Sequence, residues 1–456
     1  MSAPAQAAAA RPAAPAPAEP PADAGVRRML DEEARALLTR LARVRPFALS
    51  ETTVPAASFT VQAQAAIERY LATRRRGLRR SVLEYLAWLR GPEAARATAE
   101  EVHRRFVYQR LRFNVVLSHF DMFSEVQTQR SEHETGVFLA GLDAVAADAL
   151  DLPGRPYDPP PVICYLQRGQ GASIRRARTR LPGGGENPVA IIKVPRERMV
   201  GSGVASSLVH EVGHQGAALL GLVESLTPVL RAVAAAGGPG ATAWRLWERW
   251  CSEIVADFWS VARVGVASTL GLMGVVALPR AFVFRRALDE PHPIPWIRVK
   301  LSCAMGQALY PHPQWARLAA RWERFYPVAN ADPAMRGLLA LLEAHVRPFV
   351  ALLAGHRPRA LGGRSLGETL RSADREPAHL AALYARWERA PTLMRRSRPA
   401  LVFAAVGQAK MDGRITPEQE SRVLGHLLTY WALRSTIDAG EICASSARRP
   451  ARARTT

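Results

Sequence analysis

The stretch "LVHEVGHQ", Leu208–Gln215, places two histidines four residues apart with a glutamate directly after the first. On an α-helix, His210 and His214 lie one turn apart and point the same way, so their imidazoles can bind one zinc ion. Glu211 is offset by one position, beside such an ion rather than bound to it, where it can deprotonate a bound water. The pattern predicts a catalytic zinc helix, although two ordinary histidines in an alanine-rich helix would give the same letters.

The residues around this motif favour a buried helix that another part of the chain approaches closely. Val204, Leu208 and Val212 form an apolar stripe at helical spacing, which predicts that one face packs against a core. Gly213 and Gly216 are poor helix formers, each costing about 1 kcal/mol relative to alanine. Glycine at these positions makes sense if a neighbouring element must pass close to the helix backbone.

A catalytic zinc site needs a third protein ligand, and the sequence nearest the motif offers none at a suitable distance. Position 220, six residues after His214, is Leu220, which excludes a third histidine at that spacing. Glu224 lies ten residues after His214 and is expected on the same helix. Ten residues of helix span about 15 Å, too far to share one metal ion unless the chain turns back. The third ligand is therefore expected on another element.

Two acidic residues in "WRLWERWCSEIVADFWSVARVG", Trp244–Gly265, occupy an otherwise apolar helical stripe. They are Glu253 and Asp257, and a buried carboxylate is costly unless it is paired or bound to a metal. They share their face with three apolar residues, Leu246, Trp250 and Val264. Glu253 as third zinc ligand, with Asp257 accepting a hydrogen bond from a ligand histidine, would satisfy both acids. The alternative is that both pair with arginines, which the chain has in abundance.

Together, the two segments resemble the gluzincin metallopeptidases, whose pattern is HExxH on one helix and ExxAD, or a similar ExxxD, on a second. The matching residues are His210-Glu211-Val212-Gly213-His214 and, 39 positions later, Glu253-Ile254-Val255-Ala256-Asp257. The resemblance covers roughly residues 160–315. It implies a zinc ion bound by His210, His214 and Glu253, with Glu211 as general base and Asp257 orienting one histidine.

The resemblance also implies where a peptide substrate and an oxyanion would lie. A strand just before the HExxH helix, here Pro188–Val194, would be the edge strand that pairs with extended peptide. The segment "HPIPWIRVKL" resembles a stretch near the active site of HtpX-like and CAAX-processing gluzincins, so His292 and Arg298 are candidates for substrate binding or oxyanion stabilisation. Tyr310 and His312 are lower-ranked candidates for the same role. Those relatives are membrane proteins, so their substrates are not carried over to this chain.

Apolar residues at intervals of three and four positions predict helices through most of the chain, interrupted by one short β region. Proline-rich "RPYDPPP", Arg155–Pro161, marks a boundary, and the strand candidates after it are Val162–Gln167 and Pro188–Val194. The expected class is mainly α with a small β-sheet (α+β), in which a zincin-like catalytic core is flanked by helical regions. The expected parts are a disordered Ala/Pro-rich leader at 1–25, a helical N-terminal region at 26–155, a metallopeptidase core at 156–330, a helical C-terminal region at 331–444 and a basic disordered tail at 445–456.

The composition favours reduced cysteine thiols, and it explains the positive net charge without a nucleic-acid partner. The chain of 456 residues carries a net charge of +21, which ordinarily suggests nucleic acid or an anionic surface as partner. Three of its 61 basic residues are lysines, so an arginine-rich composition explains the charge better than a selected surface does, and nucleic acid is not favoured. Its four cysteines form no CxxC pair, which argues against a disulfide framework and favours buried thiols.

These observations lead to one favoured function and two alternatives. The favoured function is a zinc-dependent metallopeptidase, with Zn²⁺ as cofactor and a peptide or protein as substrate. The alternatives are a basic helical binding or scaffold protein with a structural or inactive zinc site, and a zinc hydrolase acting on something other than peptides. The longest uncharged apolar run, Val264–Leu278, is short for a membrane span, and no signal peptide is evident, so a cytoplasmic protein without a membrane span is expected.

Overall fold

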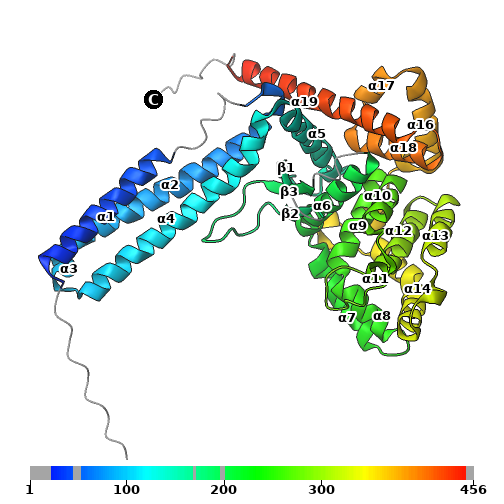
Figure 1. The fold of residues 1–456 in the computed structure, drawn as a ribbon, viewed down its shortest axis with the longest axis horizontal. Helices are drawn as coiled ribbons and strands as arrows, with labels where there is room; N and C mark the ends of the chain where they lie inside the picture. The colour runs from blue at the N-terminus through cyan, green and yellow to red at the C-terminus, as the bar shows by residue number, and fades with distance from the viewer. Residues whose placement is uncertain (1–21, 45–52, 168–170, 196–200, 448–456) are drawn as a thin grey trace, which may run out of the picture. The chain divides into compact units, whose positions relative to one another are not determined.

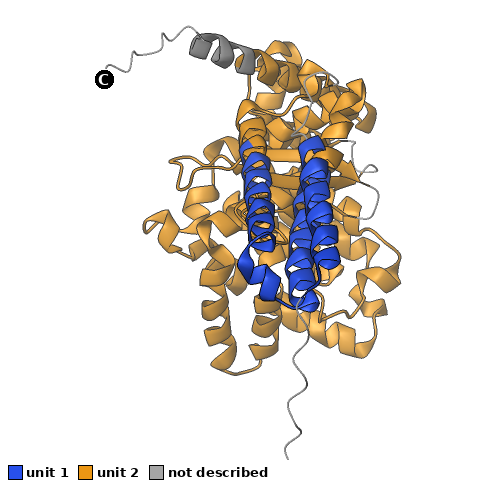
Figure 2. Cartoon of the chain, turned by 90° about the vertical axis from the view of Figure 1, so that its left-hand side faces the viewer, with its two compact units in different colours: residues 1–48, 69–122 blue, residues 49–68, 123–456 orange. Residues whose placement is uncertain are grey.

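The computed structural model describes residues 22–44, 53–167, 171–195 and 201–447 of the chain (Figure 1). Helices dominate and one small sheet is present, which confirms the expected mainly α class with a small β-sheet. The chain divides into two compact units (Figure 2). Unit 1 comprises residues 1–48 and 69–122, and unit 2 comprises residues 49–68 and 123–456.

Unit 1 is built from helices whose apolar faces pack together. Its helices are α1 (Ala24–Arg43), most of α2 (Val61–Leu89), α3 (Pro92–Arg96) and most of α4 (Ala99–Thr128). Leu30 and Leu37 of α1 and Leu71 of α2 are buried at the spacing of a helix face. A buried polar contact joins α2 to α4, where Ser81 Oγ donates to Gln109 Oε1 at 2.8 Å. This unit has no residue in common with the predicted catalytic motifs.

The sheet lies in unit 2 and has the strand order β1–β3–β2. The strands are β1 (Val162–Gln167), β2 (Ser173–Arg175) and β3 (Ala190–Pro195), with β1 parallel and β2 antiparallel to β3. The expectation that Pro188–Val194 forms the edge strand is wrong, because this segment becomes β3 and has a strand on each side. The edge next to it is β2, whose three residues are too few to produce an alternating pattern in the sequence.

One face of the sheet is covered by α5 (His133–Leu150) and α6 (Ser202–Leu220). Side chains of both helices join Ile192 and Val194 of β3 in one hydrophobic core. The predicted stripe of α6 is confirmed, since its members are 2% exposed or less: Val204, Leu208 and Val212. The helix that carries both motif histidines is therefore held rigidly against the sheet.

A sharp bend follows the motif helix at Gly221. The residue has a φ of +61°, a left-handed conformation that favours glycine, and α7 (Leu222–Ala235) departs at 81° from the axis of α6. Glu224 was expected on the same helix as the motif, and this is wrong because it lies on α7 with an exposed side chain. The segment Trp244–Gly265 likewise contains two helices, α8 (Ala241–Arg249) and α9 (Cys251–Val264), which separate at Trp250.

Further helices complete unit 2 and share its core with α6 and α9. The α-helices are α10 (Val266–Val276), α11 (Arg280–Val283), α12 (Pro295–Leu309), α13 (Gln314–Phe325), α14 (Pro333–Gly355), α15 (Leu366–Leu370), α16 (Pro377–Arg389), α17 (Thr392–Arg395), α18 (Pro399–Met411) and α19 (Pro417–Ala447). Single-turn 3₁₀ helices are η1 (Pro55–Ala57), η2 (Gln129–Ser131), η4 (Val328–Asn330), η5 (Arg359–Leu361) and η6 (Ala373–Arg375).

The compact units do not follow the boundaries expected near residues 155 and 330. Helix α5, expected in the N-terminal helical region, packs on β1 within unit 2, and the helices after residue 330 bury their apolar faces in the same core as α9. Most of the expected leader and tail lies outside the described residues. Within those expected ranges, α1 begins at Ala24 and α19 continues to Ala447.

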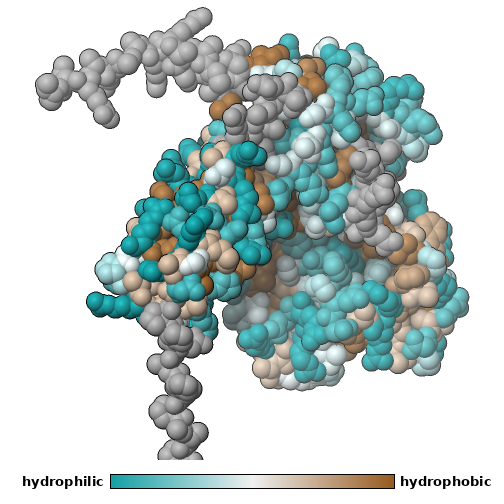
Figure 3. Space-filling model, turned by 60° about the vertical axis from the view of Figure 1, so that its left-hand side comes forward, coloured by the Kyte–Doolittle hydropathy of each residue, from teal (hydrophilic) through white to brown (hydrophobic). Residues whose placement is uncertain are grey.

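The fold bears on the expectations for the apolar run at 264–278 and for the cysteines. The run at 264–278 forms the largely buried helix α10, and the described cysteines are free and buried: Cys164, Cys251 and Cys303. In the described part of the chain, α14 is long and apolar enough to cross a membrane, and the bent pair α6–α7 passes the same test only if counted as one broken span. Hydrophilic residues cover most of the face shown in Figure 3. The expected absence of a membrane span stays a prediction.

Candidate metal centre

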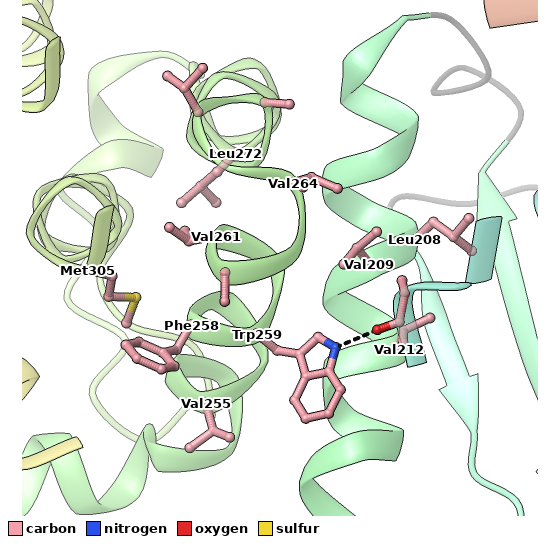
Figure 4. Packing of buried hydrophobic residues seen from close by; sticks show 14 of the residues in the cluster. Leu208, Val209, Val212, Val255, Phe258, Trp259, Val261, Val264, Leu272 and Met305 are labelled. Atoms are coloured by element: carbon pink, nitrogen blue, oxygen red, sulfur yellow. Dashed lines mark hydrogen bonds between the residues drawn. The ribbon is translucent and has the colours of Figure 1, made fainter. Parts of the chain in front are cut away.

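Two glycines of α6 allow α9 to cross it at short range. A Cβ atom at Gly213 would lie 2.8 Å from both the Cα and the carbonyl oxygen of Ala256, and one at Gly216 would lie 2.4 Å from Cη2 of Trp259. In Figure 4 the Trp259 side chain extends from α9 toward α6. The prediction that a neighbouring element passes close to these glycines is therefore confirmed. The element is α9, which also carries Glu253.

Three side chains from these two helices converge on one point: His210, His214 and Glu253. The Nε2 atom of His210 lies 3.2 Å from Glu253 Oε2, and the Nε2 atom of His214 lies 3.3 Å from Glu253 Oε1. A tetrahedral zinc ion with bonds of about 2.0–2.2 Å places neighbouring ligand atoms about 3.3–3.5 Å apart. The two histidine–carboxylate separations are close to this spacing, and the ligand atoms of all three residues lie within 4.8 Å of one another, close enough for side-chain movement to bring them onto one zinc ion. Two imidazoles and a carboxylate also form a donor set that leaves a fourth position open, as in catalytic zinc sites.

The second ring nitrogen of each histidine has a partner that fixes the ring. His210 Nδ1 lies 2.8 Å from Asp257 Oδ1, and His214 Nδ1 lies 3.4 Å from Ser252 Oγ. Because a carboxylate only accepts, the Asp257 contact holds a proton on Nδ1 of His210 and leaves Nε2 of the neutral ring available for a metal. The Ser252 hydroxyl can donate or accept, so its contact orients the His214 ring without selecting a tautomer. The contact of Asp257 is the one that the sequence suggested. Ser252 was missed, because a serine beside a ligand glutamate carries no distinctive sequence signal.

Arg298 of α12 binds the carboxylates of α9. Its Nε donates to Asp257 Oδ2 at 2.7 Å, and its Nη2 donates to Asp257 Oδ1 at 2.9 Å and to Glu253 Oε2 at 3.5 Å. The side chain is only 11% exposed. Because carboxylates occupy Nε and Nη2, the contacts favour a positioning role for Arg298 over the expected contact with substrate or an oxyanion, which stays a prediction. Arg298 is a positioning residue that holds Asp257 against His210.

His292 and Glu211 also lie beside the metal ligands, and neither orients a ligand histidine. His292 Nε2 lies 3.3 Å from Glu253 Oε2, and its side chain is 53% exposed, so it can meet a molecule arriving from solvent. Glu211 is buried, and burial raises its pKa against the opposing effect of His210 and His214. A carboxyl group with a raised pKa is suited to accepting a proton and returning it.

The two lower-ranked candidates near the end of α12 are held by other contacts. Tyr310 is fully buried and its hydroxyl donates to the carbonyl oxygen of Ala262 at 2.7 Å, so it cannot meet a substrate. The Nδ1 atom of His312 accepts from the backbone N–H of Gln314 at 3.3 Å, at the start of α13. These contacts give both residues structural roles.

The centre is electrostatically coupled through its buried charges. Burial alone would lower the pKa of His210, but Asp257 and Glu253 outweigh this effect and raise it to about 9. Burial would raise the pKa of Asp257, but Arg298 and His210 lower it to about 2. The histidines and Arg298 also hold the pKa of Glu253 well below its usual range despite burial. In the metal-free protein, His210 is therefore an imidazolium at neutral pH.

Zinc binding is accordingly expected to release about one proton per chain from His210 at neutral pH, because only the neutral imidazole can bind the metal. The apparent affinity for zinc should increase as the pH rises toward about 9, where His210 loses this proton without the metal. Calorimetric titrations in buffers of different ionisation enthalpy measure the release. The variant Asp257→Asn, which lacks the main group raising this pKa, should release less, and a heat independent of the buffer would contradict the account.

Comparisons with known proteins give no match, whether with family models, curated proteins or solved structures. The chemistry of the centre itself is therefore what points to a function.

Proposed function

We propose that this chain is a zinc-dependent peptidase. The observation that carries the proposal is the convergence of His210, His214 and Glu253, whose ligand atoms lie within 4.8 Å of one another, with Glu211 next to His210 on the same helix. A structural zinc site has no need of an adjacent base and prefers four closed ligands, often cysteine. The combination of three ligands and a buried glutamate favours catalysis over the scaffold alternative.

The roles of the residues follow from their positions. When bound, zinc would act as a Lewis acid toward the scissile carbonyl and lower the pKa of a water molecule toward about 7. Glu211 accepts a proton from the attacking water and passes it to the leaving amine. His292, the exposed group of the centre, donates a hydrogen bond to the oxyanion as it develops. Asp257 and Ser252 keep both ligand rings oriented.

A peptide substrate is supported by the strand next to the centre. The outer strand β2 packs beside α6, and shortly after it the backbone N–H of Ala177 donates to Gln215 Oε1 at 2.8 Å. Gln215 directly follows the ligand His214 in the sequence. An edge strand offers main-chain groups that pair with an extended peptide, and a substrate without a peptide backbone would not use them. The strand proposed to pair with an extended peptide is therefore β2 rather than Pro188–Val194.

Hydrolysis that depends on both zinc and Glu211 tests the proposal. The zinc-loaded chain is incubated with a mixed peptide library, and the products are identified by mass spectrometry. Cleavage should stop when zinc is chelated, return when zinc is restored, and be about a thousandfold slower in Glu211→Gln. Cleavage that survives both the chelator and the substitution would rule out the proposed mechanism.

A further inference from the structure

The strand β2 and the hairpin arm that follows it concentrate exposed arginines. Four of these side chains are exposed, Arg175, Arg176, Arg178 and Arg180. Arg178 lies near an acid, since its Nη2 is 3.7 Å from Asp158 Oδ2, and exposed Glu186 faces Arg180 across a single β-bridge. In the described ranges, no ion pair involves Arg175 or Arg176. Two positive charges, Arg175 at the end of β2 and Arg176 directly after it, are therefore available to a ligand.

The two available arginines directly precede the point where this part of the chain contacts α6. Ile174 packs against the core shared with α6, and because side chains alternate along a strand, Arg175 lies on the opposite face of the sheet. Arg176 comes next, immediately before the residue whose N–H bonds Gln215 of α6. An extended ligand along this edge would therefore meet Arg175 on the face of the sheet away from α6, and Arg176 directly before the contact with Gln215.

We propose that the outer edge of β2 selects acidic peptides. An extended segment of the substrate pairs with β2 as an additional strand, and its acidic side chains pair with Arg175 and Arg176. Side chains opposite each other on neighbouring strands lie about 4.5–5.5 Å apart, which is well within the reach of arginine. A guanidinium group also binds a carboxylate through two parallel hydrogen bonds. Cleavage of acidic peptides rests on the proposed peptidase function. Their binding to β2 does not.

A peptide fits this edge better than a nucleic acid does. Proteins that bind single-stranded nucleic acid combine a basic groove with aromatic side chains on which bases stack. The segment 173–187 contains no aromatic residue. The carbonyl oxygens of Arg175 and Arg176 accept from Asn187 Nδ2. The main-chain groups of β2 that face away from β3 match a peptide backbone.

Binding to the catalytically silent chain tests this selection without relying on turnover. The zinc-loaded Glu211→Gln variant is titrated against a fluorescein-labelled peptide of alternating threonine and glutamate, and against its threonine–glutamine counterpart. Fluorescence anisotropy should show the acidic peptide binding about fivefold more tightly. Adding Arg175→Glu and Arg176→Glu should remove this preference and favour a threonine–lysine peptide. The matched control, Arg317→Glu with Arg321→Glu on exposed positions of α13, should keep it.

The outcomes separate this inference from the proposed peptidase activity. Equal binding of the acidic and neutral peptides, or a preference that survives charge reversal at Arg175 and Arg176, would overturn acidic selection. A single-stranded oligonucleotide that binds more tightly than the acidic peptide through the same two arginines would also overturn it. If the chain prefers the acidic peptide but the wild type cleaves no peptide, acidic selection is supported and the peptidase proposal is wrong. If the wild type cleaves peptides but shows no acidic preference, the peptidase proposal is supported and acidic selection is wrong.

Discussion

Replacing Glu211 by glutamine is expected to slow peptide hydrolysis about a thousandfold while zinc remains bound. The side chain is buried beside the ligands, at 7% exposure, and a glutamine of the same shape can occupy its place. The amide cannot accept the proton of the attacking water, so the chemical step loses its general base. His210, His214 and Glu253 are unchanged, so the three metal ligands remain.

A matched control separates this effect from a general loss of an acidic residue. Glu224 lies on α7 with an exposed side chain, so Glu224→Gln should leave both zinc content and turnover near wild type. Turnover is measured with a peptide that the wild type cleaves, and zinc by mass spectrometry of the metal in each sample. Wild-type turnover in Glu211→Gln would remove Glu211 from the mechanism. Loss of zinc in that variant would make it a structural residue instead.

Replacing Gly213 by alanine is expected to destabilise the protein by about 2 kcal/mol and to weaken zinc binding about tenfold. The added Cβ would lie 2.8 Å from backbone atoms of Ala256, so α9 must move away from α6. Because Glu253 lies on α9, its carboxylate would move with the helix and leave its position opposite His210 and His214.

Replacing glycine by alanine where the added Cβ has free space should stabilise the protein instead. Gly337 lies within α14, and a Cβ added there meets nothing within 4 Å. Gly337→Ala should therefore raise the free energy of unfolding by up to about 1 kcal/mol, since alanine favours the helix. Chemical denaturation of both variants measures the contrast. A stability gain in Gly213→Ala would contradict the close crossing of the two helices.

Strongly patterned segments made much of this centre predictable from the sequence. The stripe of Val204, Leu208 and Val212 predicted the packing of α6, and the glycines that follow it predicted a close neighbour. The acids of α9 stood out because carboxylates are costly in an apolar stripe. In each case a few residues within one element carried the signal.

Other features depend on contacts that no local pattern encodes. Arg298 meets Asp257 across 41 residues of sequence, and in a chain with so many arginines nothing marks this one as the partner. The metal-ligand and arginine-pair interpretations of the two acids do not exclude each other, because Asp257 contacts both His210 and Arg298. The strand β2 was not predicted because it has only three residues. The bend at Gly221 was not predicted because a glycine in an apolar helix does not by itself indicate a turn.

The zinc content of the purified chain tests the central claim most directly. Mass spectrometry of the metal should find about one zinc ion per wild-type chain and almost none in His214→Ala, which loses one of three ligands. His379, exposed on α16, provides the matched control, and His379→Ala should retain the metal. Circular dichroism of each variant verifies that it is folded. Absence of zinc from the wild type, or equal zinc in wild type and His214→Ala, would contradict the account.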